Sequence, residues 1–230
     1  MMNENVLRAG LLATARAMAS NGLNAGTAGN ASVRSNSGFL ITPSGRSYED
    51  CGPEDMSLMA MDGSWQGPFA PSSEWRIHRD ILAARPDAGA VLHAHSPFAT
   101  ALACLRRNIP AFHYMIARFG GRDIRCAPYA TFGTQALSDG ALEALEGRNA
   151  CLLANHGMLV FGTDLRRTLA LAIEFETLCE QYWRACQLGT PTILSTSEMD
   201  EVIERFKSYG RPQPAAAPGA SDTAAPTDLD

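Results

Sequence analysis

Ala-Val-Leu-His-Ala-His, at residues 90–95, is the most informative stretch of this 230-residue sequence. Its apolar start predicts a buried strand. Alternate residues of a strand project from the same face, so His93 and His95 point the same way, about 7 Å apart along the chain. His156 also ends an apolar run, and Gly157 after it permits a sharp turn. Three imidazoles with an open fourth position are typical of catalytic zinc, although His-x-His alone also fits histidines that are merely hydrogen-bonded or on the surface.

Glu74 is a candidate fourth ligand or general base. It follows Ser72 and Ser73 at the predicted start of a helix that ends at Pro86. A carboxylate in the first turn also interacts favourably with the helix dipole. Taken alone, the position of Glu74 favours that simpler role. The side chain would then lie at an exposed helix end and contribute little to the stability of the protein.

Several turn residues offer groups that a phosphate accepts. Hydroxyl, amide and backbone N–H donors occur at Asn30, Ser44, Gly45, Ser72 and Ser73. Each of them could equally serve only its turn or helix cap.

Composition narrows the classes of function. The formal net charge of −5 excludes a broad basic surface, so nucleic-acid binding is not expected. Charges interrupt the apolar runs well short of a bilayer span, and the N-terminus lacks the pattern of a signal peptide, so we expect a cytoplasmic protein without membrane contact. Lys207 is the sole lysine among 19 basic residues and lies near the C-terminus. A Schiff-base mechanism needs a lysine inside a pocket, so amine catalysis is not expected.

The apolar spacing predicts alternating strands and helices within one domain. Helices are expected over 5–20, 72–86, 97–105, 133–145, 163–188 and 197–209, and strands over 31–34, 38–42, 57–61, 88–95, 124–127, 150–154 and 158–161. Short turns between strands favour a largely antiparallel or mixed sheet covered by helices. Residues 1–210 should form this domain. Residues 211–230 are rich in Pro and Ala and carry too few large apolar groups to fold, so we expect a disordered tail.

Seven segments occur in an order that resembles a known family. They are Gly-Thr-Ala-Gly-Asn-Ala-Ser-Val-Arg (26–34), Leu-Ile-Thr-Pro-Ser-Gly (40–45), Pro-Ser-Ser-Glu-Trp-Arg-Ile-His (71–78), His-Ala-His (93–95), Ile-Pro-Ala-Phe-His-Tyr-Met-Ile-Ala (109–117), Ala-Pro-Tyr-Ala-Thr-Phe-Gly-Thr (127–134) and Asn-His-Gly (155–157). Over about residues 5–210 they resemble the class II aldolase and adducin family, and within it the L-fuculose-1-phosphate aldolase branch.

The resemblance implies a three-layer α/β/α fold with a mostly antiparallel central sheet. It implies a homotetramer with active sites at subunit interfaces, and one Zn²⁺ per subunit. By motif, the zinc ligands are His93, His95, His156 and, in the free enzyme, Glu74, which is also the proton-transfer residue. The substrate's phosphate group is bound by Gly29, Asn30, Ser44, Gly45, Ser72 and Ser73. Tyr114 and Tyr209 match catalytic tyrosines from a neighbouring subunit, and Phe132 lines the aldehyde side.

The implied reaction is zinc-dependent cleavage of a ketose 1-phosphate, L-fuculose 1-phosphate or a similar sugar, to dihydroxyacetone phosphate and a small aldehyde. A 5-deoxyribulose- or 5-methylthioribulose-1-phosphate aldolase is the alternative, as is a related epimerase or dehydratase. An adducin-like scaffold module is the non-enzymatic alternative. Glu74 argues against the epimerases, which typically have aspartate there, and the intact metal ligands argue against the scaffold.

Two departures from the family pattern concern the substrate pocket. Ala28 replaces the more usual serine, and Arg118-Phe119 replaces small residues after Tyr114. Phe119 could favour a methyl- or methylthio-terminated aldehyde or could pack the tetramer, and both roles remain open at this stage.

Overall fold

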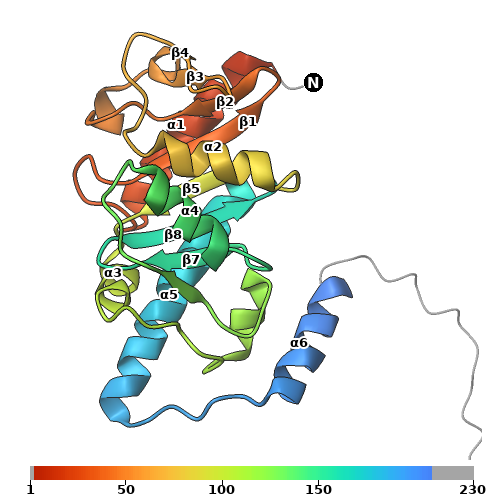
Figure 1. Cartoon of the computed structure of the whole chain (residues 1–230). Coiled ribbons are helices and arrows are strands. Elements are labelled where there is room, and N and C mark those ends of the chain that lie inside the picture. Colours follow the sequence, from red (N-terminus) through yellow and green to blue (C-terminus); the bar gives the residue numbers. More distant parts are fainter. Residues whose placement is uncertain (1–2, 209–230) are drawn as a thin grey trace, which may run out of the picture.

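A mixed eight-stranded sheet lies between two helical layers in the computed structural model, which describes residues 3–208 (Figure 1). The strand order is β4-β3-β2-β1-β5-β8-β7-β6. All neighbours are antiparallel except β6 and β7. The expected three-layer α/β/α architecture with a mostly antiparallel sheet is confirmed.

The strands form where apolar runs were expected, with one addition. They are β1 (Asn30–Ser35), β2 (Gly38–Ile41), β3 (Ser57–Met59), β4 (Trp65–Gln66), β5 (Ala90–Ala94), β6 (Arg125–Ala127), β7 (Ala150–Leu153) and β8 (Gly157–Gly162). The unpredicted β4 has only two residues, both exposed, and pairs with β3 at the sheet edge. A strand this short carries no alternation from which it could be predicted.

The helices also follow the predicted spans within a few residues. They are α1 (Glu4–Ser20), α2 (Trp75–Ala84), α3 (Pro97–Ala103), α4 (Gln135–Ala144), α5 (Leu165–Leu188) and α6 (Thr196–Ser208). Short 3₁₀ helices cover Tyr48–Asp50 (η1), Pro53–Asp55 (η2) and Tyr114–Phe119 (η3). None of these three was predicted.

Two apolar cores, one on each face of the sheet, hold the layers together. On one face α1, α3 and α5 bury residues such as Leu11 and Phe175 against Leu92 of β5. On the other, α2 and α4 bury Ile81 and Leu137 against Val91. Val91 and Leu92 thus serve opposite cores, as the two-residue period of a strand requires. Because both faces are covered, β5 is buried throughout, and its last residues are held rigidly at the centre of the sheet.

The C-terminal region extends away from these layers. The second half of α5 runs past the sheet, and α6 packs against η3 (Figure 1). Leu188, at the end of α5, is 92% exposed. Tyr209 and the predicted tail at 211–230 lie outside the described residues. Among residues 3–208, no helix combines the length and apolar character needed to cross a bilayer.

Candidate active site

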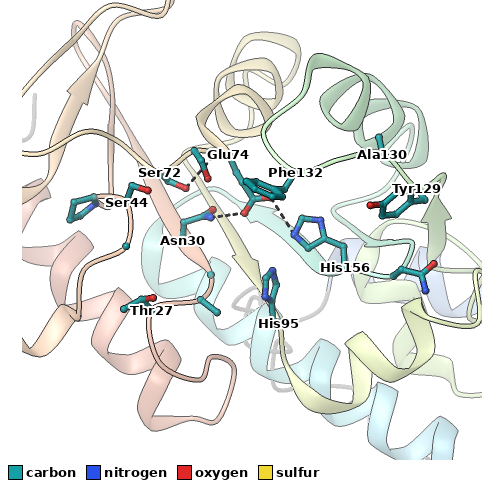
Figure 2. Close-up of a pocket in the computed structure, with 16 residues that line it drawn as sticks. Thr27, Asn30, Ser44, Ser72, Glu74, His95, Tyr129, Ala130, Phe132 and His156 are labelled. Carbon is teal, nitrogen blue, oxygen red and sulfur yellow. Dashed lines mark hydrogen bonds and ion pairs between the residues drawn. The ribbon is translucent and has the colours of Figure 1, made fainter.

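A pocket of about 340 Å³ opens where the ends of several strands meet the start of α2 (Figure 2). This volume suits a small metabolite. All six residues predicted to bind phosphate line it: Gly29, Asn30, Ser44, Gly45, Ser72 and Ser73. Glu74, His95, His156 and Phe132 line it as well. The structure therefore brings together segments that are more than 120 residues apart in the sequence.

The pocket has a polar side and an aromatic side. Ser44 and Ser72 lie on one side and Tyr129 lies on the other, with Phe132 between them (Figure 2). Six lining residues were not singled out as binding residues from the sequence: Thr27, Ala28, Pro43, Tyr129, Ala130 and Asn155. All six lie within the segments that resemble the family, so the segments, but not the individual residues, pointed to them.

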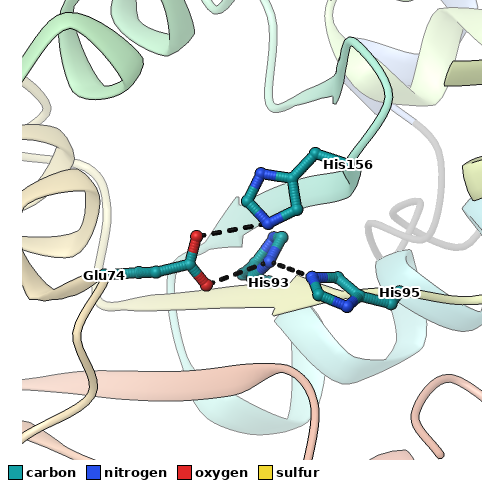
Figure 3. Close-up of side chains that lie close together, drawn as sticks. All are labelled: Glu74, His93, His95 and His156. Atoms are coloured by element: carbon teal, nitrogen blue, oxygen red, sulfur yellow. Dashed lines mark hydrogen bonds and ion pairs between the residues drawn. The ribbon is translucent and has the colours of Figure 1, made fainter. Parts of the chain in front are cut away.

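Four side chains converge at the floor of the pocket (Figure 3). One potential ligand atom from each of Glu74, His93, His95 and His156 lies within 4.8 Å of the others. The three imidazole rings are mutually edge-on, with centroids 4.7–4.9 Å apart. This arrangement matches the set of metal ligands expected from the sequence.

The backbone around His156 explains how a turn delivers its side chain. His156 lies between β7 and β8, and Asn155 before it adopts a left-handed conformation with φ 53°. The need for glycine at 157 is steric, because an added Cβ would lie 2.4 Å from the carbonyl oxygen of Ala94. The sequence-based explanation, a sharp turn at Gly157, is thus wrong in detail. Asn155 makes the turn, and Gly157 permits close packing against β5.

His93 is oriented by a hydrogen bond on its far side. Its Nδ1–H donates to the carbonyl oxygen of Met158 at 2.9 Å, which leaves the Nε2 lone pair facing the cluster. That Nε2 lies 2.9 Å from His95 Nε2 and 3.2 Å from Glu74 Oε2. A backbone acceptor on the remote nitrogen is the usual second-shell arrangement for a metal-ligating histidine.

The Glu74 carboxylate supplies a buried negative charge to the cluster. Its Oε1 is buried, lies 3.3 Å from His156 Nε2, and accepts no hydrogen bond from the described residues. An orphaned carboxylate oxygen among imidazole nitrogens fits a cation, because a buried unpaired acceptor is otherwise costly. The residues present therefore fit a divalent metal.

The protonation states also suit a metal. Burial raises the pKa of Glu74, but His93, His156 and the Asn30 amide lower it more strongly, and the net pKa is well below the ordinary value. Burial lowers the pKa of His156 to about 4 and also lowers the pKa of His95. Burial opposes protonation of His93 too, but the Glu74 carboxylate outweighs it and raises that pKa. An anionic carboxylate among mainly neutral imidazoles is the state from which a metal binds.

The expected exposed position of Glu74 is wrong. The residue is 6% exposed, and its side chain makes no cap hydrogen bond at the start of α2. Instead its backbone N–H donates to Ser72 Oγ at 3.3 Å, and its carboxylate turns toward the histidines. The sequence pattern was that of a helix start, but the side chain serves the pocket.

Both roles considered for Phe119 are also wrong. Phe119 is fully buried, and its ring packs against Phe175 with centroids 5.4 Å apart. It therefore reaches neither an aldehyde nor a partner subunit. Arg118 forms an ion pair with Glu174 at 3.3 Å.

Tyr114 is not among the described residues that line this pocket. Its side chain is 49% exposed, and its ring stacks at 6.5 Å from that of Phe206 on α6. The expectation that Tyr114 serves the site of a neighbouring subunit remains a prediction, as does the role of Tyr209.

Lys207 lies far along α6, where its ammonium group pairs with Glu204 at 2.5 Å. The lysine side chain is 67% exposed. The desolvated environment that a Schiff-base lysine requires is therefore missing around Lys207.

Residues 9–183 match the Class II Aldolase and Adducin N-terminal domain, and the chain belongs to this family. The predictions of fold, family and enzyme class are confirmed: the chain is an aldolase of the metal-dependent class.

Individual relatives are aldolases of sugar phosphates. The chain is 57% identical over 204 residues to a 5-methylthioribulose-1-phosphate/5-deoxyribulose-1-phosphate aldolase of Rhodospirillum rubrum, which covers 89% of this chain and 92% of the relative. It is 44% identical over 210 residues to an L-fuculose phosphate aldolase of Escherichia coli K12, and the match covers 91% of this chain and 98% of that relative. A solved L-fuculose 1-phosphate aldolase superimposes with a TM-score of 0.84 at 39% identity, covering 87% of this chain and 96% of that one.

Proposed function

We propose that this protein is a zinc-dependent aldolase that cleaves a ketose 1-phosphate to dihydroxyacetone phosphate and a small aldehyde. The observation that carries the proposal is the cluster of Glu74, His93, His95 and His156 at the floor of a pocket whose opposite sides are polar and aromatic. A sugar phosphate has the same asymmetry, with an anionic end and a variable end.

The four clustered side chains would hold the metal. Three imidazoles and one carboxylate form a donor set that suits Zn²⁺, and a carboxylate that can leave gives the open position of a catalytic site. When bound, the ion supplies a Lewis acid that stabilises negative charge on the three-carbon half of the substrate. That role replaces the amine that Lys207 cannot provide.

The polar side would bind the phosphate group. Gly29 and Gly45 both have positive φ and lie in loops at this side, with Ser44, Ser72 and Ser73 beside them. A Cβ at Gly29 would lie 2.2 Å from Asn24 Oδ1, so glycine lets the loop fold closely onto itself. Hydroxyl and backbone N–H groups here would fix the phosphate and so position the bond that breaks.

Cleavage moves two protons as the C3–C4 bond breaks. The C4 hydroxyl loses its proton and becomes the aldehyde, while C3 gains a proton to complete dihydroxyacetone phosphate. We assign the transfer at C3 to Glu74, which already lies in the pocket. We assign the proton of the C4 hydroxyl to Tyr114 of a neighbouring subunit, within a homotetramer whose active sites lie at the interfaces. The half-exposed position of Tyr114 outside its own pocket supports this arrangement. Tyr209 would join it there.

The aromatic side favours an aldehyde that carries no hydroxyl beyond its carbonyl group. Tyr129, Ala130 and Phe132 offer mainly hydrocarbon surface, and the 57% identical relative is named for 5-methylthio- and 5-deoxyribulose 1-phosphate. We therefore propose a 5-deoxy- or 5-methylthioribulose 1-phosphate as the preferred substrate. L-Fuculose 1-phosphate, with its hydroxylated aldehyde half, is the second candidate, since a 44% identical relative is named for it. A phosphorylated substrate that cannot cross membranes fits a cytoplasmic enzyme, with residues 1–210 as its catalytic domain.

A substrate panel tests the proposal. Purified protein is given 5-methylthioribulose, 5-deoxyribulose and L-fuculose 1-phosphates, and dihydroxyacetone phosphate is measured by a coupled reductase. We expect release from all three, fastest from the first two, with loss on chelation and recovery on adding Zn²⁺. Borohydride added during turnover should leave Lys207 unmodified by mass spectrometry. Absence of dihydroxyacetone phosphate from every substrate would refute the aldolase assignment, and a lysine adduct would refute the metal mechanism.

A further inference from the structure

His78 is a buried histidine that the reaction outlined above does not use. It lies on α2, one turn after Glu74, and is fully buried. Both of its ring nitrogens have partners on β1: Nδ1 lies 2.7 Å from Ser32 Oγ, and Nε2 lies 2.5 Å from Asn30 Oδ1. Ser32 is also fully buried, and Asn30 is 3% exposed.

These contacts continue to the metal cluster. The Nδ2 amide of Asn30 donates to Glu74 Oε2 at 3.0 Å. Ser32, His78, Asn30 and Glu74 thus form one continuous hydrogen-bonded chain, which starts in the interior of the sheet and ends on a proposed metal ligand. Asn30 also pairs in register with His93 across β1 and β5, so the chain meets the cluster at its Asn30 end.

The chemistry of the groups fixes the direction of every bond. An ionised carboxylate only accepts, so the NH₂ of Asn30 must face Glu74 and its oxygen must face His78. That oxygen also only accepts, so His78 must carry its proton on Nε2. A neutral imidazole then has its lone pair on Nδ1, which accepts the hydroxyl proton of Ser32. One tautomer of His78 and one orientation of the Asn30 amide satisfy all three bonds.

The burial of His78 keeps the ring in the form that this pattern needs. With no charged partner in direct contact, a buried imidazole is disfavoured as a cation. Burial, with a contribution from His93, lowers the pKa of His78 to about 3. The ring is therefore neutral at the pH at which aldolases work.

We propose that His78 is a positioning residue that acts through Asn30 to hold the Glu74 carboxylate in the orientation used for metal binding and proton transfer. The inference rests on the proposed function for the role of Glu74. Without the Nε2–H donor, the buried oxygen of Asn30 loses its partner, and the amide is no longer held in place against the Glu74 carboxylate. The hydrogen bond from Asn30 to Glu74 is then weakened, while the other residues proposed to bind phosphate, Gly29, Ser44, Gly45, Ser72 and Ser73, are not in contact with His78 and keep their positions.

A simpler interpretation is that His78 only fills the core between α2 and β1. The two interpretations differ in which nitrogen matters. Core filling depends on the volume of the ring, whereas positioning depends on a donor at Nε2. Three variants separate them: the amide of His78→Gln places a donor near the position of Nε2, that of His78→Asn reaches only the position of Nδ1, and His78→Leu fills volume without either group.

Kinetics, zinc retention and thermal unfolding of the zinc-loaded variants test the proposal. Loss of a second-shell partner typically costs about 10- to 100-fold in activity or metal affinity. We expect losses of this size in kcat and in zinc affinity, measured by competition with a chromophoric chelator, for His78→Asn and His78→Leu. The KM of the sugar phosphate should stay within about threefold, and His78→Gln should recover most of both losses. The unfolding midpoints of the Gln and Asn variants should be similar.

A second measurement does not depend on turnover. Imidazole ¹⁵N spectra should show His78 protonated at Nε2 and unprotonated at Nδ1. The His78 signal is assigned by its absence from the spectrum of His78→Gln. A ring protonated at Nδ1 would overturn the proposal. Equal loss of kcat in all three variants, together with lowered unfolding midpoints, would also overturn the proposal in favour of core filling. Full activity in all three variants would overturn it as well.

If the parent protein cleaves no sugar phosphate, the proposed function fails. The zinc-affinity order and the tautomer then still decide whether His78 positions Glu74.

Discussion

The floor and the rim of the pocket are built in opposite ways. The floor consists of Glu74, His93, His95 and His156, which are held by the ends of strands and the start of α2. The rim on the aldehyde side consists of Tyr129 and Phe132, which lie in a loop and are 57% and 64% exposed. One chain therefore presents its proposed metal ligands in a packed setting but leaves the surface that would recognise the aldehyde largely uncovered.

This difference separates chemistry from specificity. A metal site needs several ligand atoms in fixed positions, and these are best supplied by rigid elements with a supporting second shell. A rim on loops can change without disturbing the core. In our proposal a neighbouring subunit covers the rim and adds Tyr114. Substitutions at the floor should therefore abolish the reaction, whereas those at the rim should alter which substrate reacts.

The largest effect is expected for His95→Ala. Removal of one imidazole should release the metal and with it a Lewis acid that contributes several kcal/mol to the transition state, so cleavage should fall to background. Metal content by mass spectrometry and dihydroxyacetone phosphate release measure both. His113→Ala is the control for metal content alone, because His113 lies outside the cluster, whereas its ring packs beside that of Tyr114 and so cannot serve as a control for cleavage. Full occupancy and activity in His95→Ala would refute the metal site.

Glu74→Gln should come next, with kcat lowered about 10³-fold. The amide keeps the shape of the side chain but cannot transfer the proton, and general acid–base groups contribute about 10²–10⁴-fold. Metal affinity should fall less than in His95→Ala, because three imidazoles remain. Kinetics and chelator competition on the same preparation distinguish the two effects. If Glu74→Gln cleaved the substrate at nearly the parental rate, Glu74 would have only a structural role in the pocket.

Tyr114→Phe should lower kcat by about 10²-fold, at the lower end of the range for proton transfer. This substitution tests whether the rim is completed by a second chain. In co-expressed mixtures of Tyr114→Phe with Glu74→Gln, some sites would combine an intact Glu74 with an intact Tyr114, so part of the activity should return. Mixtures no more active than the separate variants would show that the two residues do not meet across an interface.

The smallest effect is expected for Phe132→Ala, as a change in preference. Contacts of this kind discriminate by about 1–3 kcal/mol, so the ratio of rates on 5-deoxyribulose and L-fuculose 1-phosphates should move by about tenfold. Phe119→Ala is the matched control: it should leave the ratio unchanged but cost about 3–5 kcal/mol of unfolding free energy, because it opens a cavity in the core. An unchanged ratio in Phe132→Ala would remove Phe132 from aldehyde recognition.

Predictions from the sequence succeeded where local patterns and packing agree. Apolar runs located most of the strands, and helical periodicity located α1 to α6 within a few residues. The strand end at His93 and His95 brought two imidazoles into one cluster as predicted, because alternation on a strand fixes where side chains project. Local pattern failed for Phe119 and for the exposure of Glu74, although the family motif had already grouped Glu74 with the histidines. Glu74 lies at a helix start, and Phe119 follows the segment that contains Tyr114. Neither segment has a local feature that shows which way the side chain points.

The sequence by itself determined the order of elements, the family and the three histidines proposed as metal ligands, and it contains Lys207 as its sole lysine. These features depend on periodicity, residue chemistry and ordered motifs, all of which are local in the chain. Only the tertiary structure decided that Glu74 turns inward, that Phe119 belongs to the core, and that Ser32, His78 and Asn30 form one directed chain to Glu74. Phe119 packs in the core on the other face of the sheet, against Phe175 of α5. The hydrogen-bonded chain arises because β1 lies between β5 and β2, with His78 of α2 against Ser32 and Asn30. That arrangement buries polar groups more than 40 residues apart in the sequence, which must then satisfy one another.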